Sequence, residues 1–169
     1  MKVAALAVTV ALAFTVSGTA QDRTNSLGNG VAPMATTDPE MMIYRVAGVV
    51  NSSTTTMSGA ATSFMCYSNS AANEKVRIRI LNWNGQLEGD IYYVIQSKRT
   101  LTFSTQLTAL LAEDAVVAGG KVINQGTAAI IATSKEVYCS AMVVDAAATV
   151  PNGIALHMVR FNPAPGTVE

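Results

Sequence analysis

The clearest pattern in the chain is an alternation of basic and apolar residues over positions 75–80, which read Lys-Val-Arg-Ile-Arg-Ile. In a strand, Val76, Ile78 and Ile80 would project to one face and the three basic side chains to the other. A helix would not separate these residues in this way. The pattern therefore predicts a strand that is buried on one face and open to solvent on the other.

A hairpin is expected directly after this strand. The dipeptide Asn84-Gly85 is typical of a two-residue turn, because both residues accept positive φ. The chain then returns through the apolar run 91–95, which we expect to pair with the first strand.

Similar short runs, separated by turn-forming residues, continue along the chain. The further expected strands span residues 43–50, 62–68, 100–105, 127–133, 137–145 and 154–161. Residues 128–132 and 141–144 are apolar on both faces, which is typical of central strands or of strands under a second layer. The pattern predicts an all-β domain, an antiparallel β-sandwich (Ig-like or jelly-roll-like) of about eight strands. An eight-stranded ligand barrel is the alternative.

One segment, residues 107–117, has an ambiguous pattern. Leu107, Leu110 and Leu111 are spaced as on one face of a helix, but Asp114 interrupts that face. We expect a short helix or a turn here.

The first 20 residues have the organisation of a cleavable signal peptide. Lys2 supplies a positive charge, residues 3–16 are apolar apart from threonine, and small residues at 17–20 suit cleavage after Ala20. A membrane anchor is the alternative, but the apolar run is shorter than the roughly 20 residues that span a bilayer. We therefore expect a secreted or periplasmic protein, with no transmembrane segment after the signal is removed.

The two ends of the mature chain differ from its middle. Residues 21–40 are rich in Gly, Pro, Asn and Thr and predict an extended N-terminal arm, either a mobile terminus or a donor strand for a neighbouring subunit. Residues 41–162 form the expected sandwich domain. Residues 163–169 form an extended C-terminal tail, since Pro163 and Pro165 stop sheet pairing.

The chain has two cysteines, Cys66 and Cys139, each in the middle of an expected strand. An even count in an exported protein favours a disulfide over free thiols. Parity allows the bond if the face shared by Phe64 and Cys66 and the face shared by Cys139 and Ala141 both point inward. Neither cysteine belongs to a C-x-x-C pair, so a metal or redox site would need other residues.

Charge is sparse in this chain. Its 169 residues include 11 Lys and Arg and 11 Asp and Glu, so the formal net charge is zero. Without a basic excess, nucleic acid is not an expected partner. Weak charge repulsion favours self-association or attachment to a surface. The expected partner is a protein or glycan at the cell surface, or a second copy of the chain.

Candidate catalytic and metal-binding residues are few. His157 is the only histidine, no G-x-S-x-G motif accompanies it, and it alternates with apolar residues as in a strand. The carboxylates that could form a hydrolase pair lie at expected turns or strand ends: Glu88, Asp90, Glu113, Asp114 and Asp145. We therefore expect no enzyme, no cofactor and no metal site.

Three aromatic residues near the expected hairpin, Trp83, Tyr92 and Tyr93, form the one candidate ligand site. Flat aromatic rings can stack on sugars, although ordinary packing between strands also explains them.

The end of the chain contains the pattern G-x-A-L-H-x-x-R-F-N-P-A-P-G-T-x-E, carried by Gly153, Ala155 to His157 and Arg160 to Glu169. It resembles the ending of a group of small uncharacterised exported bacterial proteins, as do the first cysteine strand and residues 126–134. The resemblance implies a bacterial exported protein and assigns no site residues. The expected function is non-catalytic binding or assembly at the cell surface or outside the cell, and the alternative is carbohydrate or small-ligand binding at the aromatic hairpin.

Overall fold

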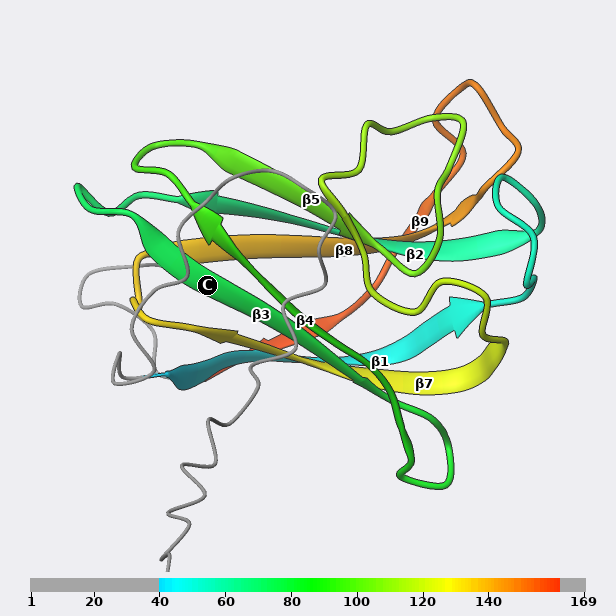
Figure 1. Cartoon of the computed structure of the whole chain (residues 1–169), viewed down its shortest axis with the longest axis horizontal. Coiled ribbons are helices and arrows are strands. Elements are labelled where there is room, and N and C mark those ends of the chain that lie inside the picture. The colour runs from blue at the N-terminus through cyan, green and yellow to red at the C-terminus, as the bar shows by residue number, and fades with distance from the viewer. Residues whose placement is uncertain (1–39, 162–169) are drawn as a thin grey trace, which may run out of the picture.

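The computed structural model describes residues 40–161 (Figure 1). The expected signal peptide, residues 21–39 of the expected arm, the tail and residues 162–169 of the C-terminal motif lie outside the described residues. Glu40, the last residue of that arm, is described and forms an ion pair with Lys75 at 2.7 Å.

All regular secondary structure between residues 40 and 161 is β, which confirms the predicted class. The segment 107–117, for which a short helix or a turn was expected, forms irregular chain and a two-residue strand instead. The strands are β1 (Met41–Asn51), β2 (Ala60–Ser68), β3 (Glu74–Leu81), β4 (Leu87–Ile95), β5 (Thr100–Ser104), β6 (Ala115–Val116), β7 (Ile123–Ala132), β8 (Val137–Asp145), β9 (Ile154–Ala155) and β10 (Met158–Arg160).

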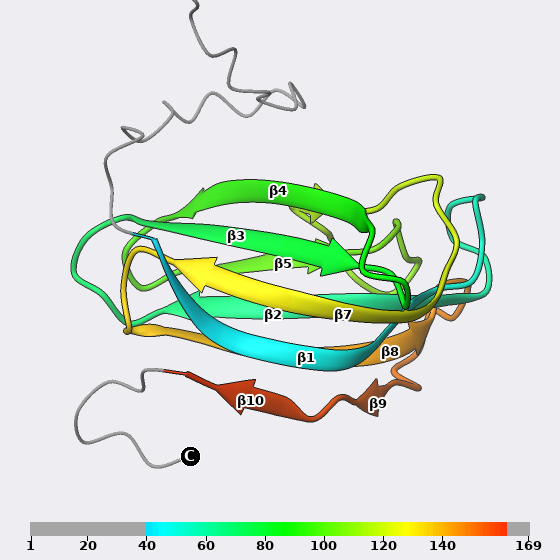
Figure 2. The same cartoon turned by 90° about the horizontal axis from the view of Figure 1, so that it is seen from below.

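The strands pair into one strongly curved sheet that nearly closes into a barrel. Its main order is β4-β3-β7-β1-β2-β5-β6, with β10 added to β1, β8 added to β2 and β9 added to β8. β1 and β2 pair at a single position, Asn51 opposite Ala61. The pairings therefore form two groups, β4-β3-β7-β1-β10 and β6-β5-β2-β8-β9, which face each other in Figure 2.

Residues 40–161 form ten strands, where the sequence predicts about eight. The difference lies in short pieces: the expected strand 154–161 divides into β9 and β10, and β6 arises from the ambiguous segment. β7 is a central strand between β3 and β1, as its apolar residues on both faces predicted. β8 likewise lies between β2 and β9.

The hairpin of β3 and β4 confirms the alternation of residues 75–80. Val76, Ile78 and Ile80 are fully buried, and Ile78 lies opposite Ile91. The predicted two-residue turn is wrong. Residues 82–86 form a longer loop in which only Gly85 has positive φ, at 81°, and the bulge between Ile80 and Leu81 shifts the register before it.

Where β1 meets β2, buried hydroxyl groups take the place of most backbone pairing. Thr62 Oγ1 accepts a hydrogen bond from the Val50 N–H (2.8 Å) and donates to the Val50 carbonyl oxygen (3.1 Å). Thr105 Oγ1 accepts from the Thr62 N–H and donates to the same carbonyl. Both threonines are fully buried, so these bonds satisfy backbone groups that water cannot reach.

The apolar core lies between the two groups of strands. Its largest fully buried side chains are Phe64, Phe103, Ile43, Ile78, Ile80, Ile95, Ile123 and Ile130. Gly89 of β4 allows the chain at Val117 to come close to this strand, because a Cβ there would lie 2.3 Å from the Val117 carbonyl oxygen. Residues 115–118 therefore pack against the inner face of β4, which is the edge strand of its group.

Candidate binding surfaces

The two cysteines form the predicted disulfide. Cys66 of β2 lies directly opposite Cys139 of β8, with their Cα atoms 4.1 Å apart. Cys66 is fully buried and Cys139 packs against the same core. The bond joins two neighbouring strands of one group, and its position within the core makes its role structural.

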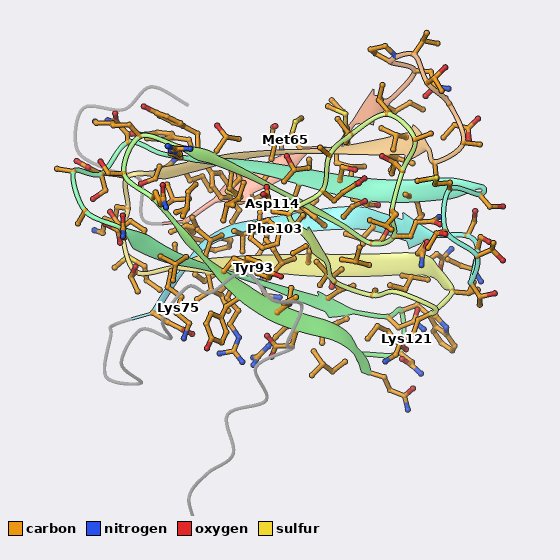
Figure 3. The ribbon with its side chains drawn as sticks, turned by 45° about the horizontal axis from the view of Figure 1, so that its top comes forward. Met65, Lys75, Tyr93, Phe103, Asp114 and Lys121 are labelled. Atoms are coloured by element: carbon orange, nitrogen blue, oxygen red, sulfur yellow. A yellow bond between two sulfur atoms is a disulfide. The ribbon has the colours of Figure 1, made fainter. Side chains whose placement is uncertain are left out.

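The structure does not bring the three candidate aromatic residues together. Trp83 lies in the loop 82–86 and is 74% exposed. Tyr92 is on the outer face of β4, where the Lys75 ammonium lies 4.2 Å from its ring centre. Tyr93 points inward and packs edge-on against Phe103, with ring centres 6.0 Å apart (Figure 3). Consecutive strand residues face opposite ways, so Tyr92 and Tyr93 cannot form one platform.

Trp83 belongs instead to a larger surface at one end of the molecule, which we call the loop end. It is formed by residues 52–59, 82–86, 105–114, 117–122 and 146–153, which connect the strands toward the right of Figure 1. Of the ten exposed large apolar side chains in the described part of the chain, seven lie in these loops or directly beside them: Met57, Trp83, Leu87, Leu107, Val122, Val150 and Ile154.

The loop end also carries few charges. Its five loops contain three charged residues, Glu113, Asp114 and Lys121, and residues 52–59, 82–86, 105–112 and 146–153 contain none. The connections at the opposite end of the molecule, by contrast, include Lys98, Arg99, Lys135 and Glu136. Exposed apolar groups and sparse charge thus coincide at one end.

Hydrogen bonds hold three of these loops, 52–59, 105–114 and 146–153, to one another. The Met57 N–H donates to the Leu107 carbonyl oxygen (2.9 Å), and the Ala109 N–H donates to the Ala146 carbonyl oxygen (2.8 Å). Gln106, which is 2% exposed, donates from Nε2 to the Ser58 carbonyl oxygen (2.9 Å). Sequence reasoning missed Gln106, because nothing in its neighbours marks a polar residue for burial.

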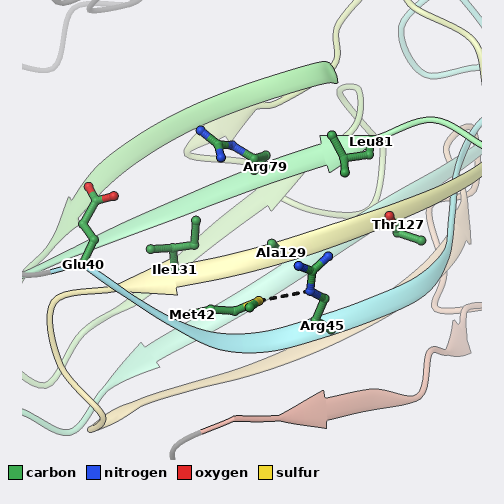
Figure 4. Close-up of a pocket in the computed structure, with 8 residues that line it drawn as sticks. All are labelled: Glu40, Met42, Arg45, Arg79, Leu81, Thr127, Ala129 and Ile131. Atoms are coloured by element: carbon green, nitrogen blue, oxygen red, sulfur yellow. Dashed lines mark hydrogen bonds between the residues drawn. The ribbon is translucent and has the colours of Figure 1, made fainter. Parts of the chain in front are cut away.

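A second surface feature is a groove on the outer face of β1, β7 and β3, with a volume of about 390 Å³. Figure 4 shows Arg45 and Arg79 on either side of it. The groove is lined by Glu40, Met42, Arg45, Arg79, Leu81, Thr127, Ala129 and Ile131. None of these residues stood out in the sequence as a site.

The strand register explains this arrangement. Arg45 of β1 and Arg79 of β3 are both directly opposite Ala129 of β7, on the same face of the sheet. Ala129 contributes only a methyl group to the floor between the two longer side chains. The Arg45 Nε lies 3.1 Å from the sulfur of Met42.

The carboxylates on this face are each shared between two cations. Glu40 contacts Lys75 and Arg77, and Asp90 contacts Arg77 and Arg79. Burial alone would raise the pKa of both carboxyl groups. The hydrogen bonds and positive charges of these neighbours outweigh it and lower both pKa values below their usual range.

The chain matches no protein-family model, no curated protein and no solved structure. The resemblance of the C-terminal motif therefore stays a prediction, and the surfaces are interpreted from their own chemistry.

Three of the carboxylates considered for catalysis, Glu88, Glu113 and Asp114, have structural contacts, and among the described residues His157 has none that would make it a catalytic base. His157 is exposed in the break between β9 and β10. Asp114 accepts from the Thr102 N–H (2.7 Å), and Glu113 accepts from the Thr108 hydroxyl (2.6 Å). Glu88 pairs with Lys121 at 3.2 Å.

Residues 40–161 contain neither a metal-binding cluster nor a membrane-spanning helix. No group of three or more His, Cys, Asp or Glu side chains in that part of the chain is placed to hold a metal ion. The same residues include no helix long and apolar enough to cross a membrane.

Proposed function

We propose that this protein is an exported, non-catalytic binding domain that engages a protein partner, or a second copy of itself, through the loop end. The observation that carries the proposal is the gathering of exposed apolar side chains on loops with few charges. Scattered exposed apolar residues are normal on any protein, but their concentration at one end is typical of an interaction site.

The residue types at the loop end favour a protein partner. Trp83 and Met57 are of kinds enriched in the centres of protein interfaces, where charged residues are depleted. The hydrogen bonds between the loops also support the proposal. Loops that are already fixed lose less conformational entropy when a partner binds.

Export is supported by two features of the chain. Residues 1–20 have the pattern of a signal peptide. The Cys66–Cys139 disulfide suits an oxidising compartment such as the bacterial periplasm or the medium. We further propose that the fold is a β-sandwich. β1 and β2 pair at only one position, and no other pair of strands within residues 40–161 connects the two groups.

The direct test is photo-cross-linking of the full-length chain, produced and exported in its own bacterium. A photo-reactive phenylalanine analogue replaces Trp83 in one version and Lys98, at the opposite end, in the other. We expect a cross-linked product of defined mass from position 83 and none from position 98. Identical products from both positions, or no product from either, would exclude the loop end as the interface.

Self-association is tested separately by light scattering of the purified exported protein. The double variant Trp83→Ser/Val150→Ser should shift any oligomer toward monomer, whereas Lys98→Ser should not. A strictly monomeric wild-type protein at the highest accessible concentration would remove the homo-oligomer from the proposal.

Carbohydrate binding at Trp83 is the second candidate. The exposed indole is flanked by the amide side chains of Asn82, Asn84 and Gln86, which can hydrogen-bond sugar hydroxyls. On a glycan array, binding that is lost in Trp83→Ala but kept in Tyr67→Ala would support it. A silent array would dispose of it.

A further inference from the structure

We propose that the groove between Arg45 and Arg79 binds a small amphiphilic anion, a molecule with one carboxylate or phosphate head and an apolar body. This site is on the outer face of the sheet and is separate from the loop end. The inference therefore does not depend on the function proposed above.

The positions of the two arginines provide the anion site. Because both lie opposite Ala129, their Cα atoms are separated by two strand spacings, roughly 10 Å. Only the Ala129 methyl group stands between them. Arg79 already donates to Asp90 from Nε (3.1 Å) and Nη2 (3.0 Å), so its Nη1 group is the part that remains for an oxyanion. Arg45 is not held by a carboxylate and can turn its guanidinium toward the same oxyanion from the other side.

The balance of charge on this face also favours an anion. Three of the cations on this face, Lys75, Arg77 and Arg79, share two carboxylates, Glu40 and Asp90. Arg45 is a fourth cation on the same face. The chain as a whole has a net charge of zero, so the positive excess is local to this face.

Arg45 is the cation on this face that lacks a carboxylate partner among residues 40–161. Its guanidinium instead contacts the uncharged sulfur of Met42. An anionic head group between Arg45 and Arg79 would supply the missing charge.

The carboxylate that lines the groove does not block this site. Glu40 Oε1 contacts Lys75 (2.7 Å) and Oε2 contacts Arg77 (3.3 Å), so both oxygens are turned toward cations at one end of the groove. Arg77, the nearer of these two cations, is two residues before Arg79 along β3.

The other residues that line the groove are the reason for expecting a ligand with an apolar body. Met42, Leu81 and Ile131 are outward-facing positions, where a strand open to solvent usually carries polar residues. An apolar ligand segment beside the head group would cover them. The volume of about 390 Å³ is at the lower end of the range of small-molecule sites, roughly 300–1,000 Å³, which suits one short chain or a single ring.

The test is isothermal titration of the full exported protein with matched probes. Octanoate and octyl phosphate carry the two head groups on one apolar body, acetate and inorganic phosphate carry them without it, and octanol lacks the charge. We expect saturable binding of octanoate, octyl phosphate or both, at least tenfold tighter than that of acetate, inorganic phosphate and octanol. Comparison of the two octyl probes identifies the head group.

Variants assign the binding to the groove. Arg45→Gln should weaken it tenfold or more, and Ala129→Leu should abolish it by filling the floor without changing any charge. Arg99→Gln, which removes a cation at the opposite end, should leave it unchanged, and circular dichroism verifies that each variant is folded. No saturable binding of either octyl probe, or equal binding by wild type and Arg45→Gln, overturns the proposal. Loss of binding in Trp83→Ser would also overturn it, by placing the site at the loop end.

Discussion

Asp90 of β4 binds Arg77 of β3 with both carboxylate oxygens, at 2.6 and 2.8 Å, although the residue directly opposite Asp90 is Arg79. Arg79 also donates to one of those oxygens, from Nε (3.1 Å) and Nη2 (3.0 Å). The Asp90 carboxylate thus binds both Arg79, which lies directly opposite it, and Arg77, which lies diagonally across the hairpin. The Asp90 side chain is only 17% exposed, so solvent screens these contacts less than it would on an open surface.

Removing this carboxylate should make stability less dependent on acid pH. The hydrogen bonds and positive charges of Arg77 and Arg79 outweigh the effect of burial and lower the pKa of Asp90 below its usual range. A carboxyl group whose pKa is lower in the folded than in the unfolded protein stabilises the folded state at pH values above its unfolded pKa. This contribution is lost as the pH falls through its folded pKa. Asp90→Asn should therefore cost about 1–2 kcal/mol at pH 7 and less at pH 3.

Urea unfolding at pH 7 and pH 3 measures this difference. Glu136→Gln is the matched control, since Glu136 is exposed in the turn between β7 and β8, and it should change stability by less than about 0.5 kcal/mol. A constant effect of Asp90→Asn across this pH range would show that the ion pairs are not its source.

The disulfide should account for a large part of the stability of the fold. Cys66 and Cys139 are separated by 73 residues in sequence, and closing a loop of this length stabilises by about 4 kcal/mol in the chain-entropy model. The native oxidised protein should show no titratable thiol. Cys66→Ala/Cys139→Ala should unfold at a markedly lower temperature, and reduced wild type should match it. A free thiol in the native protein would contradict the pairing.

Gly89 should not tolerate a side chain. A Cβ at this position would lie 2.3 Å from the carbonyl oxygen of Val117 and 3.0 Å from its carbonyl carbon, and backbone atoms cannot rotate away. The Val117 N–H is itself held by the Ser104 carbonyl oxygen (2.7 Å). Gly89→Ala should therefore destabilise the protein by about 2–3 kcal/mol, as overpacked cores do.

The control is Gly119→Ala, because the nearest atom to its added Cβ is a side-chain carbon of Val116 at 3.2 Å. Thermal unfolding of both variants measures the contrast. Equal melting temperatures for Gly89→Ala and wild type would mean that the chain at Val117 does not lie against β4.

Local patterns were enough to predict the features that depend on neighbouring residues. The alternation around Ile78 predicted β3, and the parity of Cys66 and Cys139 allowed their pairing. Consecutive strand residues face opposite ways, and Tyr92 and Tyr93 are adjacent in one strand. This rule alone places the two rings on opposite faces of the sheet. The turn at Asn84-Gly85 was misjudged because the bulge at Ile80 and Leu81 shifts the register before the turn.

The surfaces depend on residues far apart in sequence, which local patterns do not bring together. Arg45, Arg79 and Ala129 form a groove only because β7 pairs with both β1 and β3 in this particular register. The loop end likewise collects five connections from different parts of the chain. Sparse charge in several loops was visible in the sequence, but their common location was not.

Arg160 should anchor β10 to the strands around it. It lies in β10, and its guanidinium donates to the hydroxyl of Tyr44 and to the carbonyl oxygen of Lys135 (2.7 Å). The same group lies 5.1 Å from the ring centre of Tyr44 and 4.6 Å from that of Tyr138. It therefore connects β10 to β1, to β8 and to the turn between β7 and β8. Arg160 is also the first residue of the R-F-N-P segment.

Arg160→Lys keeps the charge but loses the planar group that reaches several partners at once. We expect faster hydrogen exchange in residues 154–161, with little change in residues 137–145, because β10 opens locally when its anchor is weakened. Arg45→Lys, on the opposite face of β1, is the control and should exchange like wild type. If exchange of residues 154–161 is unaffected by Arg160→Lys, backbone bonds such as that from the Phe161 N–H to the Ile43 carbonyl oxygen (2.7 Å) are sufficient to hold the end of the domain.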